Sequence, residues 1–283
     1  MTTRELAPHP VSRSGEWSAV AGLFALTLRQ HTHGRRIYVL AVLYLLPCAL
    51  AVLLRSLPHP APAEALEFAL LFGLLPHALA PLTALLYAAG VVTDEVEEQT
   101  LTYLLLRGVP KWKLYVTKLL ATLCVTTVLV AVAVLALYTA IYVGMPGFGS
   151  EILPRAGKAV VVMALAQVGY CALFGFLGLF TKRSLLAGVG YIVVIEGIMA
   201  GIDFAGRALT VVYYVRTLAL RWLDFPREHL RRYQDVWGME ELAVLPSAGS
   251  CVLTVVGISL LVVLLSARWF ARSEYRVKTP GSE

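Results

Sequence analysis

Runs of twenty and more largely apolar residues recur along this chain of 283 residues, and they limit the folds that it can adopt. A run of about 20 apolar residues is long enough to cross the hydrocarbon core of a membrane as an α-helix. The composition agrees, because only 15% of the residues are charged, compared with about 25% in an ordinary soluble domain. The sequence therefore predicts an all-α, polytopic membrane protein.

Six membrane spans are predicted from the apolar runs and the charges that separate them. They cover residues 37–54, 68–92, 119–143, 159–180, 184–202 and 246–267. Before them, Trp17, Phe24 and Leu28 recur at helical spacing in a more polar stretch, which is typical of an amphipathic helix in the membrane interface. The alternative is that this stretch begins the first span early. The resulting regions are an N-terminus with the interfacial helix (1–35), a transmembrane domain (36–271) and a tail (272–283).

The basic residues indicate which side of the membrane the termini face, because cytoplasmic segments carry an excess of Lys and Arg. With both termini inside, fifteen of the 24 Lys and Arg residues fall in inner segments and nine in outer segments. We therefore expect cytoplasmic termini in a cell (inner or plasma) membrane, and an extracytoplasmic or re-entrant segment at 203–245. A seventh span at 209–223 would place the tail outside, but that stretch is short and contains Arg216 and Arg221.

Residues 94–118, between the second and third spans, form the densest polar segment between two apolar runs. Acidic residues open this polar segment and basic residues close it, an order that complements the dipole of a helix. Leu101, Leu104 and Leu105 share one helical face, which suits docking into a groove on another protein. The alternative is a solvated loop whose charges only follow the rules of membrane topology.

The polar segment resembles the signature after the second span in permeases of type-2 ATP-binding-cassette (ABC) exporters. In that family an acidic pair and a leucine run precede a proline turn, a basic–aromatic cluster and a lysine that opens the third span. The layout of an interfacial helix, six spans and a long outer segment before the last span is also similar. Gln99, Thr102 and Gly108 depart from the pattern. The positions that fit it are Glu95, Glu97, Thr100, Leu101, Leu104, Leu105, Pro110, Lys111 and Lys118.

The resemblance implies that the polar segment contains a coupling helix, which contacts a separate nucleotide-binding ATPase subunit and transmits its ATP-driven closure to the spans. The residues assigned to coupling are Glu95, Glu97, Glu98, Thr100, Leu101, Leu104, Leu105, Pro110, Lys111 and Lys113. It also implies a second permease subunit, identical or different, that shares the pathway.

The sequence contains no G-x-x-x-x-G-K-[ST] phosphate loop. We therefore expect no cofactor and no catalytic residue in this chain, with ATP and Mg²⁺ bound by the partner ATPase. The four cysteines fall in apolar spans without metal-ligand spacing, so no metal site is predicted. The basic residues lie mainly at span ends, which indicates membrane lipid rather than nucleic acid as their partner.

Glu196 is the one carboxylate in the middle of a predicted span. Ionisable residues at that depth are costly and mark functional sites by default. The alternative is a neutral, hydrogen-bonded glutamic acid that joins two helices. Gly197 and Gly201 have the G-x-x-x-G spacing that permits close helix approach. His77 and Gln167 are more typical of satisfied polar groups than of ligands.

Two other functions fit a similar layout. An intramembrane enzyme that acts on lipid is disfavoured, because the sequence contains no G-x-S-x-G or H-E-x-x-H and no paired His and carboxylate in its spans. A membrane scaffold that binds an ATPase without transporting anything also agrees with the sequence. We predict the permease subunit of an ABC exporter.

Overall fold

A computed structural model describes residues 13–97, 110–181, 183–199, 205–223, 225, 234–237, 239 and 244–273. Every regular element in these ranges is a helix, as the sequence predicts. The principal elements are α1 (Arg13–His33), α2 (Arg35–Ser56), α3 (Ala63–Leu66), η1 (Glu67–Leu79), α4 (Ala80–Ala88), α5 (Gly90–Glu97), α7 (Lys111–Tyr142), η2 (Phe148–Ile152), α8 (Leu153–Phe180), α9 (Ser184–Tyr191), η3 (Ile192–Ile198), η5 (Ala205–Leu209), α10 (Val211–Trp222) and α12 (Ala248–Arg272).

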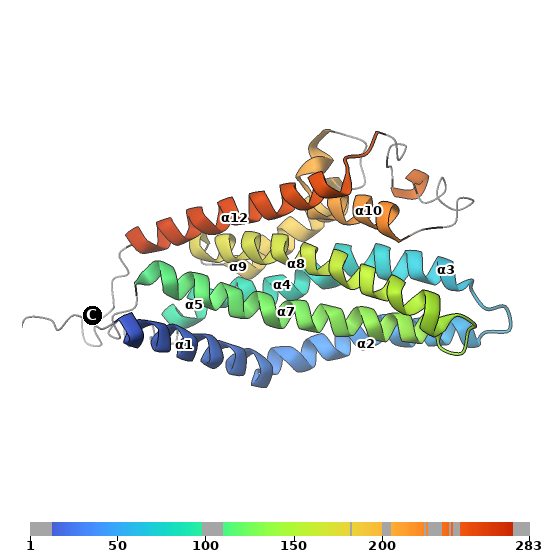
Figure 1. The fold of residues 1–283 in the computed structure, drawn as a ribbon, viewed down its shortest axis with the longest axis horizontal. Helices are drawn as coiled ribbons and strands as arrows, with labels where there is room; N and C mark the ends of the chain where they lie inside the picture. The colour runs from blue at the N-terminus through green and yellow to red at the C-terminus, as the bar shows by residue number, and fades with distance from the viewer. Residues whose placement is uncertain are drawn as a thin grey trace, which may run out of the picture.

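The long helices run along one axis and form a bundle with two distinct ends (Figure 1). One end carries α1 and α5, and we name it the α1 end. The other carries α3 and the turn between α7 and α8, and we name it the α3 end. The last turn of α12 also lies at the α1 end (Figure 1), where the carbonyl of Ser273, directly after α12, accepts a hydrogen bond from Lys111 of α7.

Five helical runs among the described residues are long and apolar enough to cross a membrane. They are Arg35–Ser56, Ala63–Asp94, Lys111–Tyr142, Phe148–Phe180 and Ala248–Arg272. These runs correspond to the first, second, third, fourth and sixth predicted spans. The second, third and fourth begin earlier in the chain than predicted, because their first turns contain charged residues that the hydropathy pattern assigns to loops.

Of the fifth predicted span, residues 184–202, the structure describes residues 184–199. α9 and η3 together cover Ser184–Ile198, which falls below the length expected of a spanning helix. A helix needs about 20 residues to cross the hydrocarbon core of a bilayer. Within the described ranges, the structure therefore shows five helices of spanning length and one shorter apolar helix at the position of the fifth predicted span, whose residues 200–202 lie outside the described residues.

The second run contains two prolines and accommodates them by changing its hydrogen-bond register. Pro76 lies inside η1, which is a π-helix, and Pro81 lies in the first turn of α4. Proline lacks a backbone N–H, and local π geometry with neighbouring side chains compensates for the missing bonds. From α8, the hydroxyl of Tyr170 donates to the carbonyl of Pro76 (3.1 Å), and the amide of Gln167 donates to the carbonyl of Ala80 (2.9 Å).

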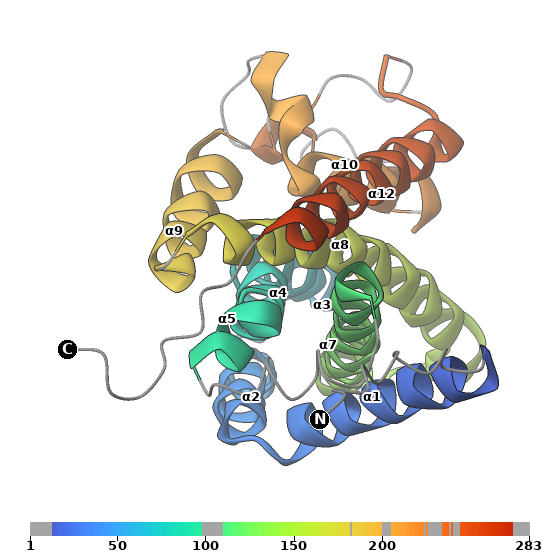
Figure 2. The same cartoon turned by 90° about the vertical axis from the view of Figure 1, so that its left-hand side faces the viewer.

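α8 is the central helix of the bundle, since it packs against α4, α7, α10 and α12 (Figure 2). Gly178 allows α8 to approach the junction of α4 and α5, because a Cβ at that position would overlap the carbonyl oxygen of Ala89. α2 and α12 lie at the edges of the bundle and expose apolar side chains such as Val42 and Leu253. Such surfaces are suited to lipid or to another membrane-embedded surface.

Candidate functional site

The polar segment 94–118 is described at its two ends, both at the α1 end of the bundle. Its centre, residues 98–109, lies outside the described residues, as do the side chains of Glu95 and Glu97. The predictions for Glu98, Thr100, Leu101, Leu104 and Leu105 therefore lie outside the described part of the chain. α5 leads into the segment, and α7 begins within it at Lys111.

The entry to the polar segment is held against the start of α2. The guanidinium of Arg36 forms an ion pair with the carboxylate of Asp94, with 2.9 Å between Nη2 and Oδ2. Arg36 also donates from Nη1 to the carbonyl of Leu86 in α4 (3.0 Å). Gly90 leaves room for the Asp94 carboxylate, because a Cβ on Gly90 would lie 2.6 Å from its oxygens. α2, α4 and α5 are therefore joined through Arg36.

The exit from the polar segment contains three of the predicted coupling residues. The carbonyl of Pro110 accepts hydrogen bonds from the backbone amides of Lys113 (3.0 Å) and Leu114 (3.2 Å), which starts α7. The ammonium of Lys113 lies 5.5 Å from the centre of the Trp112 ring. Lys111 donates from Nζ to the carbonyl of Ser273, directly after α12 (2.8 Å). The exit is thereby attached to the end of α12.

Lys118, the last residue of the polar segment, links α7 to α5, the helix that leads into the segment. Its Nζ donates to the carbonyl of Val91 in α5 (3.3 Å), and the residue is only 5% exposed. α7 begins at Lys111, so Lys118 lies about two turns inside the helix, and its position at the opening of the third span stays a prediction. The charges after the proline therefore belong to the helix and not to a loop.

α1 is attached to the same region through His31. The hydroxyl of Thr122 donates to the carbonyl of Lys118 (2.9 Å), so Thr122 Oγ1 accepts the Nε2–H of His31 (2.9 Å). The hydroxyl of Tyr87 in α4 donates to the carbonyl of His31 (3.3 Å). Burial, followed by the charges of Lys118 and Arg36, lowers the pKa of His31 from 6.5 to about 4. The imidazole is therefore neutral at neutral pH.

Glu196 is held by a different set of helices. Its carboxylate accepts hydrogen bonds from the backbone amides of Val211 (3.0 Å) and Val212 (3.1 Å) and from the hydroxyl of Tyr191 (2.9 Å). Carboxylates are favoured at a helix N-terminus, so Glu196 stabilises the first turn of α10. This geometry agrees with a glutamate that joins two elements. Gly197 has no atom of another described helix within 4 Å of the position of an added Cβ.

A second contact fixes α10 against the second spanning run. His77 donates from Nδ1 to the carbonyl of Gly73 (2.7 Å), which leaves Nε2 to accept from the guanidinium of Arg216 (2.7 Å). The same guanidinium lies 5.4 Å from the centre of the Trp237 ring. His77 is therefore a satisfied polar group, as predicted, and α10 is anchored at two points along its length.

A comparison with known protein families identifies the family of this chain, which the geometry alone does not. The profile described as ABC-2 family transporter protein matches residues 32–198, which is more than half of the chain. The chain belongs to the ABC-2 family of transporter proteins. No curated protein is similar enough to match this chain.

The match to the ABC-2 family runs from the end of α1 through η3 and includes the whole polar segment. α10 and α12 lie beyond it. Membership of this family, together with the apolar spanning helices, establishes a multi-pass membrane protein of the ABC transporter permease type. The resemblance stated from the motif and layout is therefore confirmed at the level of the family.

A buried polar cluster around Glu67, in the described part of the chain, was not predicted from the sequence. Glu67 is completely buried at the α3 end, where its carboxylate accepts from the hydroxyls of Tyr138 (2.7 Å) and Tyr142 (2.5 Å). Nε of Arg155 lies 2.9 Å from the same carboxylate. The sequence places Glu67 and Arg155 in loops before spans. The two tyrosines, four residues apart on one face of α7, were the available signal for a shared polar partner.

Proposed function

We propose that this chain is the permease subunit of an ABC exporter and that the polar segment 94–118 couples it to a separate nucleotide-binding ATPase. ATP and Mg²⁺ would be bound by that ATPase, and this chain would form the translocation pathway with a second permease subunit. Family membership supports the transporter class. The exposed apolar faces of α2 and α12 support a contact with a second subunit within the membrane.

One observation carries the proposal: both ends of the polar segment are bonded to the spanning helices. Asp94 connects the entry to α2 through Arg36. Lys118 connects α7 to α5, and Lys111 connects the exit to the end of α12. A displacement of the polar segment would therefore act on α2, α7 and α12 together, because packed helices move as units about their contacts.

The proposed orientation places the α1 end in the cytoplasm, where an ATPase could reach the polar segment. The excess of basic residues in the segments at this end supports that orientation. Segment 203–245 would then begin on the outer side and re-enter the bundle. The contacts of α10 with Glu196 and with His77, which lie inside predicted spans, support the re-entrant alternative.

Charge reversal in the polar segment tests the proposed coupling. The tagged chain is purified in mild detergent from its own cells, and the accompanying ATPase is identified by its phosphate-loop sequence. We expect the Glu97→Lys/Glu98→Lys variant to lose at least tenfold of the ATPase that co-purifies with the wild type. Acidic side chains can contribute several kcal/mol when they pair with a partner's cations in a buried interface.

The matched control is Glu151→Lys, which reverses one exposed carboxylate in η2 at the α3 end. It should retain the wild-type amount of ATPase, since the proposed contact lies at the opposite end of the bundle. The coupling proposal is wrong if the Glu97→Lys/Glu98→Lys variant keeps both the wild-type amount of ATPase and the wild-type rate of ATP hydrolysis.

A further inference from the structure

A cavity of about 430 Å³ lies at the α1 end, between the last turns of α1, the start of α2, α5 and α7. Its volume falls within the range of about 300–1,000 Å³ that is usual for small-molecule sites. Polar side chains line much of it, including Gln30, His31 and Thr122. The cavity is therefore large enough and polar enough to hold the headgroup of an amphiphile.

The net charge of the cavity indicates whether its ligand is an anion or a cation. Arg35, Arg36 and Lys118 line it together with one carboxylate, that of Asp94, so the charged side chains among the described lining residues sum to three minus one, or +2. Asp94 pairs with Arg36 at 2.9 Å. His31 adds no charge at neutral pH, because burial and the neighbouring cations keep it neutral. The net positive charge favours an anion, and a guanidinium with an ammonium is a usual combination for phosphate.

The surface beside the cavity favours an amphiphilic ligand over a free ion. Arg35 opens α2, and Tyr38, Val39 and Val42 follow it at i+3, i+4 and i+7, the spacing of one helical face. All three are exposed, Tyr38 at 71% and Val42 at 70%. Because α2 is a spanning helix, this face continues from the cavity into the hydrocarbon region. A phosphate in the cavity would therefore have apolar surface directly beneath it.

We propose that this cavity binds the phosphate of an anionic phospholipid, with the acyl chains lying along the exposed face of α2. Arg35 and Lys118 supply the charge for the phosphate, while Asp94 keeps Arg36 oriented at the edge of the site. The lipid would fill the angle between α1 and α2 and so hold α1 beside the polar segment. This inference requires membrane insertion only and does not depend on the identity of the ATPase.

Native mass spectrometry of the full chain, titrated with phosphatidylglycerol or phosphatidylcholine in detergent, tests this proposal. We expect phosphatidylglycerol to bind at least tenfold more tightly than phosphatidylcholine. Arg35→Gln should weaken phosphatidylglycerol binding about fivefold, since a basic residue near anionic lipid contributes about that factor. Arg35→Lys should retain most of the affinity, because it keeps the charge.

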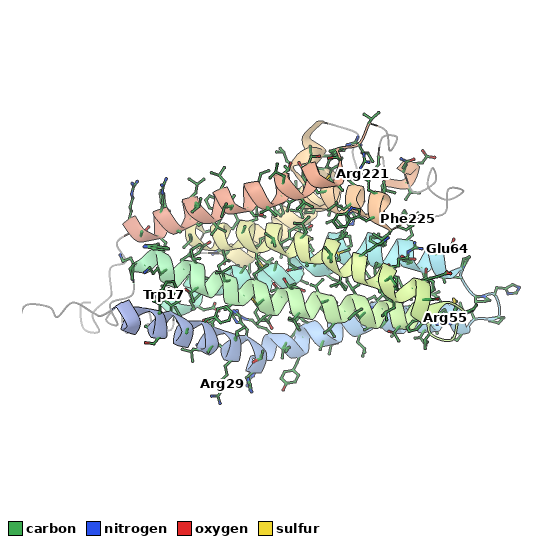
Figure 3. All side chains as sticks on the ribbon, in the orientation of Figure 1. Trp17, Arg29, Arg55, Glu64, Arg221 and Phe225 are labelled. Carbon is green, nitrogen blue, oxygen red and sulfur yellow. The ribbon has the colours of Figure 1, made fainter. Side chains whose placement is uncertain are left out.

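Arg29→Gln is the matched control, because Arg29 projects from α1 away from the bundle (Figure 3) and does not line the cavity. It should leave phosphatidylglycerol binding unchanged. Equal effects of Arg35→Gln and Arg29→Gln, or equal binding of the two lipids, would overturn the proposal. Inorganic phosphate is the remaining probe: if it binds with the same sensitivity to Arg35→Gln while phosphatidylglycerol shows none, the site takes a free anion and the assignment to lipid is wrong.

Discussion

Replacement of Glu67 by alanine is expected to lower the free energy of unfolding by about 3–5 kcal/mol. The change leaves the partly buried guanidinium of Arg155 without its carboxylate, which lies 2.9 Å away in the native protein. It also removes the acceptor for the hydroxyls of Tyr138 and Tyr142. An unsatisfied buried polar group costs about 1–3 kcal/mol, so the two effects act in the same direction. Denaturant unfolding of the purified protein in detergent measures the loss.

Glu64→Ala provides the comparison for this prediction, because Glu64 lies in the preceding turn and is less deeply buried than Glu67. It should cost less than about 1 kcal/mol, as expected for a partly exposed charge. Glu67→Gln should fall between the two, since an amide oxygen still accepts one of the hydroxyl bonds but does not neutralise Arg155. Equal stabilities of the Glu67→Ala and Glu64→Ala variants would show that the cluster does not hold the α3 end together.

Gly178→Ala is expected to destabilise the protein by about 1–3 kcal/mol. A Cβ at this position would overlap the backbone carbonyl of Ala89, which cannot move without shifting the junction of α4 and α5. A clash with backbone atoms cannot be relieved by rotating a side chain, so α8 must move away from this junction. The same unfolding measurement detects the effect.

Gly157→Ala, in the same helix, should change the stability of the protein in the opposite direction. An added Cβ at Gly157 meets no atom within 4 Å. Alanine in a helix interior is more favourable than glycine by about 0.5–1 kcal/mol, so this variant should be slightly more stable than the wild type. If both variants shifted stability in the same direction, close packing of α8 on Ala89 would not be the reason for glycine at position 178.

The helices of the bundle could be predicted because long apolar runs are typical of segments that lie in a membrane. The ends of these helices were predicted less accurately. Lys111 and Arg155 are charged residues of the kind that hydropathy assigns to loops, yet they lie in the first turns of helices. A hydropathy pattern records solvation preference and does not record whether a neighbouring helix satisfies a charge.

The sequence predicted the position of the polar segment 94–118 but not the contacts that its residues make with other helices. The order of charges in 94–118 identifies the segment, because it depends only on local sequence. The partners of Asp94, Lys111 and Lys118 lie on α2, α12 and α5, and their pairing depends on the register between helices. Glu196 shows the same limit: its depth in a span was evident, whereas its bonds to the start of α10 require the tertiary fold.

Hydrogen–deuterium exchange of the assembled complex, with and without ATP and vanadate, tests the coupling network most directly. In the wild type we expect nucleotide to alter amide exchange in the polar segment and in α2, α7 and α12. The Arg36→Gln/Asp94→Asn variant breaks a pair whose side chains are 41% and 37% exposed, so it should fold with a loss of less than about 1 kcal/mol. Its response should persist in the polar segment and fall at least twofold in α2. A response in α2 as large as that of the wild type would contradict the proposed transmission through Arg36 and Asp94.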